Sequence, residues 1–239
     1  MTSVTIAKRF NGPPNSGNGG YSAGLLAQFV SGPCRVRLLR PPPLETALTV
    51  SQDDKGVVLR DADGDIARAW ATSVDIDVPA APSAAEVSRC EARYRGHATH
   101  NFPSCFVCGP DRDVGDGLRL FSGPRDSRSD HVAAAWHPDE SLAAPDGNVD
   151  PVFIWAALDC PGAFSFEHGE NMGVVLGEIA VAIDAPIRVG EALTVIGWHI
   201  ASDGRKHDTG TAIVRDGTTV VARGQARWFE VDPAVFKLT

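Results

Sequence analysis

The chain has 239 residues, of which 43% are hydrophobic and 22% are charged, and this is enough for two compact units of about 100–130 residues each. Its formal net charge of −8 argues against nucleic acid as a partner, because binding to a phosphate backbone needs a basic surface. No stretch approaches the roughly 18 apolar residues of a membrane span, and the N-terminus lacks the apolar segment of a secretory signal, so we expect a cytoplasmic protein that does not bind membranes.

The first predicted element is a helix that begins after Asn18. Asn is a favoured N-cap residue, and Gly32-Pro33 supplies a stop signal further along. The apolar face of this helix would be formed by Tyr21, Leu25, Leu26, Phe29 and Val30. Extended runs rich in Val, Ile, Thr and Trp follow, separated by Asp-Gly turns, and they predict about four strands.

The next segment, from about Pro79 to Ser104, is rich in Ala, Pro, Ser and charged residues, and this composition indicates a linker. The second unit is expected to start near Cys105, with opening strands over residues 118–121 and 131–136. We therefore predict a first unit over residues 1–82, a linker over 83–104 and a second unit over 105–239.

The helix of the second unit is predicted to begin at Pro151. Asp150 can cap it, and Pro suits the first helical position. Residues 152–158 are apolar all round, which is typical of a buried helix. Pro161 should end or kink the helix, because Pro lacks the backbone N–H and clashes with the preceding turn.

The two units repeat each other in order and spacing. Residues 47–50, Ala-Leu-Thr-Val, recur at 192–195, and the Asp-Gly turn at 63–64 recurs at 216–217. The separation is slightly larger at the second match, so we expect a longer loop around residues 202–206. Each unit thus places a buried helix before an antiparallel meander. This arrangement predicts an α+β fold in which each sheet wraps around its own helix.

Several short motifs resemble one superfamily. The run Gly19-Gly20-Tyr21-Ser22-Ala23-Gly24-Leu25-Leu26 is similar to the start of the central helix in the acyl-CoA thioesterase II-like branch of the hotdog superfamily, and Asn18-Gly19-Gly20 resembles the His-Gly-Gly motif of phenylacetyl-CoA-type thioesterases. Cys105-Phe106-Val107-Cys108-Gly109 is similar to the opening of many small hotdog proteins. Ala156-Ala157-Leu158-Asp159 lies where such proteins place the catalytic acid.

The resemblance implies a tandem, or double, hotdog fold of two antiparallel sheets, each wrapped around a central helix, that acts on acyl thioesters. It covers nearly the whole chain. The units depart from the pattern in complementary ways: the first has no acid between Gly19 and Gly32, and the second begins its helix with Asp150-Pro151 in place of Gly-Gly.

Asp159 is the candidate catalytic acid. A carboxylate within such an apolar run is expensive to bury without a function, and desolvation would raise its pKa. It could then serve as a general base towards water or as a nucleophile towards the thioester. The structural alternative is that the helix ends at Pro161 and leaves Asp159 at a solvated terminus.

The second candidate group is Asn18-Gly19-Gly20, whose backbone N–H groups at a helix start could polarise a carbonyl. The alternative is a plain N-cap followed by flexible glycines. We assign Tyr21 and Trp155 as candidate substrate contacts. Arg205 and Lys206 are candidates for the phosphates of CoA, although a basic turn is more often simply solvated.

Five cysteines scattered over the chain do not form a disulfide framework. Cys105 and Cys108 form a Cys-x-x-Cys pair close to His97 and His100, which could together supply four zinc ligands. A lone Cys-x-x-Cys is a weak signal, so the favoured interpretation is buried small side chains, with no metal and no cofactor. Cys160 is also expected in the core.

The leading hypothesis is hydrolysis of an acyl-CoA or acyl-carrier thioester at one composite site per chain, with donors from Gly19 and Gly20 and the acid from Asp159. The alternatives are a non-catalytic acyl-CoA-binding or regulatory protein, and an enoyl-CoA hydratase or dehydratase. A hydratase would pair the acid with a His, and the nearest one, His168, lies nine residues further on. The two units form an internal pseudo-dimer, and further homo-oligomerisation is left open.

Overall fold

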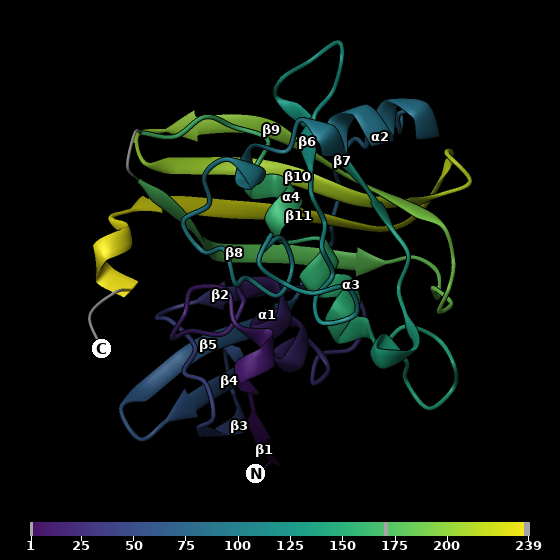
Figure 1. The fold of residues 1–239 in the computed structure, drawn as a ribbon. Helices are drawn as coiled ribbons and strands as arrows, with labels where there is room; N and C mark the ends of the chain where they lie inside the picture. The colour runs from purple at the N-terminus through teal and green to yellow at the C-terminus, as the bar shows by residue number, and fades with distance from the viewer. Residues whose placement is uncertain (1, 170–171, 237–239) are drawn as a thin grey trace.

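The computed structural model describes residues 2–169 and 172–236, in which eleven strands form one antiparallel sheet (Figure 1). The first unit contains β1 (Thr2–Thr5), α1 (Gly19–Ala27), β2 (Cys34–Leu38), β3 (Ala47–Asp53), β4 (Gly56–Asp61) and β5 (Gly64–Ala71). A helix α2 (Ala84–Ala92) follows. The second unit contains β6 (Gly123–Pro124), β7 (His131–Trp136), α3 (Pro151–Ala157), α4 (Cys160–Ala163), β8 (Gly173–Ile183), β9 (Leu193–Asp203), β10 (Lys206–Arg215) and β11 (Thr219–Val231). Short 3₁₀ turns cover Lys8–Phe10, Arg95–His97, Glu140–Leu142 and Pro233–Phe236.

The strand order confirms the duplicated plan. From edge to edge it is β1-β3-β4-β5-β2-β8-β11-β10-β9-β7-β6. Apart from β6, each strand of the first unit has a counterpart at the same distance from the centre in the second unit: β2 and β8, β5 and β11, β4 and β10, β3 and β9, and β1 and β7. The equivalent strands β2 and β8 therefore meet at the centre. They pair antiparallel, from Cys34 opposite Val181 to Arg37 opposite Glu178. The two sheets expected to pack side by side are therefore joined by backbone hydrogen bonds into one.

The repeated peptides occupy equivalent places in this sheet. Residues 47–50 open β3 and their counterparts lie at the start of β9, while the two Asp-Gly turns join β4 to β5 and β10 to β11. The sequence predicted a longer loop in the second copy, and this prediction is wrong. The extra length lies in β9 and β10, which have 11 and 10 residues where β3 and β4 have 7 and 6. A tight turn at Gly204, with a φ of 57°, joins them.

Both helix starts lie where the capping residues predict. The Asn18 side chain accepts a hydrogen bond from the Tyr21 N–H, and the Asp150 side chain accepts one from the Val152 N–H. Pro151 occupies the first turn of α3. The chain leaves the helix after Ala157, and the four-residue α4 follows the break. Pro161 thus divides the predicted helix in two.

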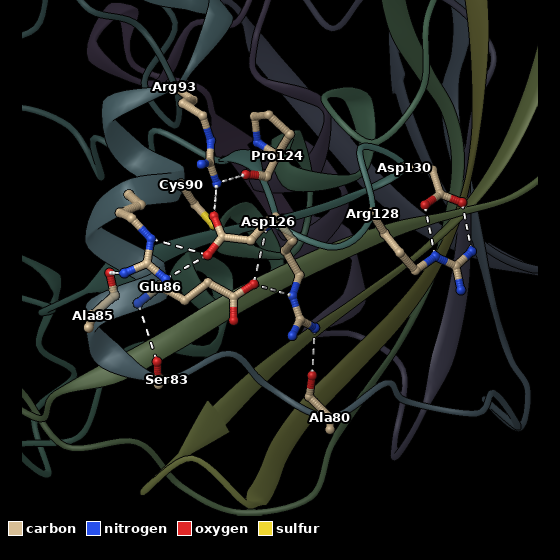
Figure 2. A network of polar contacts seen from close by, with 12 residues as sticks. Ala80, Ser83, Ala85, Glu86, Cys90, Arg93, Pro124, Asp126, Arg128 and Asp130 are labelled. Atoms are coloured by element: carbon tan, nitrogen blue, oxygen red, sulfur yellow. Dashed lines mark hydrogen bonds and ion pairs between the residues drawn. The ribbon is translucent and has the colours of Figure 1, made fainter.

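The predicted linker contains structure of its own. Ser83 caps α2, and the apolar face of this helix, with Val87 and Cys90, packs on the outer face of the second unit's sheet. Alternate residues of β7 and β9 face opposite sides of the sheet, so Ala133 and Ile196 belong to the same apolar cluster as α2 while their neighbours face the main core. Figure 2 shows polar contacts that hold α2 in place, among them Arg93 paired to Asp126. Arg89 also pairs with Asp126, and Arg125 pairs with Glu86.

One predicted strand is wrong. Residues 118–121 form no strand, because Arg119 has a φ of 52°, in the left-handed region that interrupts extended backbone. The side chains of Leu118 and Leu120 are nevertheless buried. Their N–H groups donate to the carbonyl oxygens of Phe106 and Val107, so this segment packs as an ordered loop against the Cys-x-x-Cys turn.

The two central helices pack directly on each other within the core that both units share. Glycines permit this contact: a Cβ on Gly20 would lie 2.5 Å from the Asp159 Cβ, and one on Gly24 would lie 2.8 Å from the Trp155 Cβ. Gly20, near the start of α1, therefore lies against the end of α3, and Gly24, one turn later, lies against its beginning. This antiparallel packing brings the first turn of α1 to the break after α3.

An ion-pair cluster crosses the junction between the units. Glu178 of β8 accepts hydrogen bonds from Arg35 and Arg37 of β2, at 2.5 and 2.7 Å, and its side chain is only 11% exposed. Burial alone would raise the pKa of Glu178, but the hydrogen bonds and charges of the two guanidinium groups outweigh it, and the net shift is downward. The ionised carboxylate therefore stabilises the folded chain.

We expect Glu178→Gln to lower the free energy of unfolding by about 1–3 kcal/mol, since charged hydrogen bonds are lost across the junction. The stability that ionised Glu178 contributes is fully present above the ordinary carboxyl pKa of 4.5. It is lost as the pH falls through the lowered pKa of Glu178 in the folded state. Denaturant titrations of both proteins from pH 7 down to acid should therefore converge. Asp208→Asn, which breaks the exposed pair with Arg227, serves as the control and should change stability much less.

Candidate functional site

The break after α3 places Asp159 against the first turn of α1. The carboxylate is buried, with 2% of the residue exposed, and its Oδ2 accepts two hydrogen bonds. The donors are Asn18 Nδ2 at 2.8 Å and the Gly20 N–H at 3.0 Å. The acid and the helix start come from different units, and the structure brings together Asn18, Gly20 and Asp159, three of the four catalytic candidates.

The other oxygen of Asp159, Oδ1, is buried and has no hydrogen-bond partner within the residues that the structure describes. Burial raises the pKa of this carboxyl to about 7, although the Gly20 N–H and the Asn18 amide oppose the shift. A buried acceptor without a partner is rare in folded proteins, and it identifies a place where a water or ligand can bind.

The helix-start donors are not equivalent. The Gly20 N–H is already used by Asp159, and the Tyr21 N–H is used by the Asn18 side chain. The Gly19 N–H has no acceptor among residues 2–169 and 172–236. Gly19 also lines the cavity described below, so of the two predicted oxyanion donors it is the one free to contact a ligand.

A cavity of about 760 Å³ adjoins these groups and is lined by Asn18, Gly19 and Asp159. Both units contribute to its wall, which lies next to the β2–β8 junction. Its apolar lining includes Leu38, Leu39, Phe102, Phe164, Val174, Leu176, Trp228 and Phe229. The volume and the combination of an apolar wall with polar groups are typical of a site for a small organic ligand.

The four predicted substrate contacts lie elsewhere. Tyr21 is buried and stacks on Phe10, with ring centroids 4.1 Å apart. Trp155 is buried where α3 crosses α1. Arg205 and Lys206 are exposed at the turn between β9 and β10. None of the four lines the cavity.

The cations on the cavity wall are residues that the sequence did not single out. Arg95 lines the cavity, and its guanidinium donates to the carbonyl oxygens of Ala163 and Phe166. Arg40 also lines it and pairs with Asp61. Neither residue belongs to a short motif, so only the folded chain reveals them. His168 of the hydratase hypothesis lies on this wall as well.

Three cysteines converge beside Asp159. The Sγ atoms of Cys105, Cys108 and Cys160 all lie within 4.8 Å of one another, and all three residues are buried and line the cavity. His100 contacts this group, with Nε2 3.4 Å from the Cys108 Sγ. His97 does not, because its ring packs on Tyr94 and Phe121.

The chain matches no protein-family model and no curated protein. It is similar to solved structures at low sequence identity. The acyl-CoA thioesterase II TesB2 of Mycobacterium marinum superimposes with a TM-score of 0.59 at 14% identity, over 98% of this chain and 93% of that one. The TesB protein of Mycobacterium avium subspecies paratuberculosis gives a TM-score of 0.59 at 14% identity, over 96% and 92%.

A third structure, assigned as an oleoyl thioesterase of Lactobacillus plantarum, has a TM-score of 0.57 at 10% identity and covers 96% of this chain and 95% of that one. These matches extend over both units and confirm the predicted α+β double hotdog fold. In the described part of the chain, no helix is both long and apolar enough to cross a bilayer.

Proposed function

We propose that this protein hydrolyses an acyl-CoA thioester in the cavity between its two units. The observation that carries the proposal is the buried Asp159 in the cavity wall. One of its oxygens is held by Asn18 and Gly20, and the other has no partner among the described residues. Two solved structures with the same fold bear thioesterase names, which supports the reaction class.

Asp159 acts as the general base in this proposal. Its Oδ1 accepts a proton from a water, the water oxygen bonds to the thioester carbon, and the Gly19 N–H stabilises the oxyanion that forms. Collapse of this intermediate breaks the C–S bond, and the proton held by Asp159 passes to the departing sulfur. The products are a carboxylic acid and the free thiol of CoA.

The cavity wall suits an apolar acyl group. Leu176, Trp228 and Phe229 supply apolar surface from β8 and β11. Arg95 and Arg40 also lie on this wall, each paired with a carboxylate, Glu167 and Asp61 respectively. In this proposal the acyl chain packs on the apolar wall, and the two guanidinium groups are candidate contacts for the phosphates of CoA.

One site per chain follows from the asymmetry of the helices. The pseudo-equivalent position pairs the start of α3 with the end of α1. Pro151 there has no N–H to donate, and the Val152 N–H is used by Asp150. Helix α1 carries no acid, so that position has neither of the groups required for hydrolysis.

The test measures release of the CoA thiol from straight-chain and aromatic acyl-CoA esters, together with equilibrium binding of the same ligands. We expect turnover that varies with the acyl group and a stoichiometry of about one ligand per chain. Tight binding without hydrolysis would contradict the proposal in favour of a binding protein. Addition of water to an enoyl-CoA, with its thioester intact, would do so in favour of a hydratase.

A further inference from the structure

The three-cysteine cluster joins segments that are far apart in the chain. Cys105 and Cys108 lie on one turn, and Cys160 lies at the start of α4. Buried thiols commonly serve as small apolar side chains, which is how the sequence pattern was interpreted. Packing alone does not require three sulfur atoms to converge, and this convergence was not visible from the Cys-x-x-Cys spacing.

The sulfur positions fit a tetrahedral metal site. Zinc–sulfur bonds of about 2.3 Å place the sulfurs of a tetrahedral site about 3.8 Å apart. The Cys105 and Cys160 Sγ atoms lie 3.8 Å apart, and Cys108 completes a triangle within 4.8 Å. No disulfide joins the five described cysteines, so all three sulfurs are free to bind.

Backbone contacts fix the turn that carries Cys105 and Cys108. The Cys105 N–H donates to the Phe102 carbonyl oxygen, and the Gly109 N–H donates to the Cys105 carbonyl oxygen, both at 2.9 Å. Gly109 closes the turn, since a Cβ there would lie 2.6 Å from the Cys105 nitrogen and carbonyl oxygen. The Tyr94 hydroxyl fixes the other side by donating to the Cys108 carbonyl at 2.8 Å. These contacts hold the sulfurs in place before any ion binds.

Two polar side chains surround the sulfurs. Nδ1 of His100 accepts the Phe102 N–H at 2.9 Å, so the neutral ring carries its proton on Nε2. That proton points to the Cys108 sulfur, which makes His100 a donor to the thiolate and not a ligand. The Asn18 Nδ2 lies 3.8 and 3.9 Å from the sulfurs of Cys105 and Cys160. Such outer donors are typical of the surroundings of metal-binding thiolates.

We propose that Cys105, Cys108 and Cys160 bind one Zn²⁺ as thiolates, with a water from the cavity as the fourth ligand. The cavity that all three residues line gives the ion a route to the buried sulfurs. Reactive zinc sites have three protein ligands and one exchangeable ligand, whereas structural zinc sites have four protein ligands. Binding releases the thiol protons to solvent. This assignment does not depend on the proposed thioesterase activity.

The test is metal analysis of the full chain purified under reducing conditions without chelator. We expect about one zinc per chain in the wild-type protein, and loss of that zinc in Cys105→Ala, Cys108→Ala and Cys160→Ala. The matched controls are Cys34→Ala and Cys90→Ala, which alter the two buried cysteines outside the cluster and should keep the metal. Circular dichroism checks the fold of each variant.

A second measurement applies if the cluster variants fail to fold. Reduced, metal-free wild-type protein titrated with Co²⁺ should develop thiolate-to-metal charge-transfer and tetrahedral d–d bands that saturate at one equivalent, and Zn²⁺ should bleach them. Failure to take up either ion, or stoichiometric copper or iron in place of zinc, would overturn the proposal. His100→Ala should still bind the metal ion. Complete loss of the ion in this variant would contradict the assignment of water as the fourth ligand.

Discussion

Asp159→Asn should reduce thioester hydrolysis by roughly 10²–10⁴-fold while the chain stays folded and binds substrate. The amide has almost the same shape as the carboxylate, and its oxygen can still accept the hydrogen bonds of Asn18 and Gly20. It cannot take a proton from water. Steady-state release of CoA thiol, with binding measured separately, should therefore show a loss in kcat and a nearly unchanged dissociation constant.

Asp150→Asn is the matched control for this experiment. Asp150 is an acid at the opposite end of α3, where it caps the helix, and it does not line the cavity. Asn is an equally good capping residue, so the variant should keep both stability and rate. If Asp159→Asn hydrolyses the same substrate at the wild-type rate, Asp159 is not the base.

The parts of the fold that the sequence predicted depend on local chemistry. Asn18 and Asp150 cap their helices through contacts two or three residues away, and Pro161 ends a helix through its own ring. The linker helix carries a similar signal, Ser83 followed by Glu86, and the Glu86 N–H does donate to the Ser83 hydroxyl. Its Ala- and Pro-rich surroundings masked this signal.

The parts that could not be predicted depend on contacts between distant segments. Tyr21 and Trp155 lie on helices that are apolar on nearly every side, so periodicity does not show which side faces the cavity. The Cys160 sulfur lies 3.8 Å from the Cys105 sulfur because the chain, after the break that follows α3, runs towards the Cys-x-x-Cys turn. Arg95 lines the cavity through the fold of the linker, where composition indicated no structure.

Gly20→Ala should impair the protein in two ways. A Cβ at this position would lie 2.5 Å from the Asp159 Cβ and 2.7 Å from the Trp155 carbonyl oxygen. Backbone atoms cannot move aside cheaply, so α1 and α3 must separate, at a cost of about 1–3 kcal/mol for overpacking. The higher helix propensity of Ala returns up to about 1 kcal/mol of this. The shift also lengthens the hydrogen bond from the Gly20 N–H that positions the carboxylate.

Gly24→Ala separates the two effects. It lies one turn further along the same face of α1, where a Cβ would meet the Trp155 Cβ at 2.8 Å and the Val152 Cα at 3.0 Å. Both variants should therefore lower the free energy of unfolding by similar amounts in denaturant titrations. At a temperature where each is fully folded, Gly24→Ala should retain most of the wild-type kcat, and Gly20→Ala should lose most of it. Equal activity of the two folded variants would show that the contact between Gly20 and Asp159 serves only the packing of the helices.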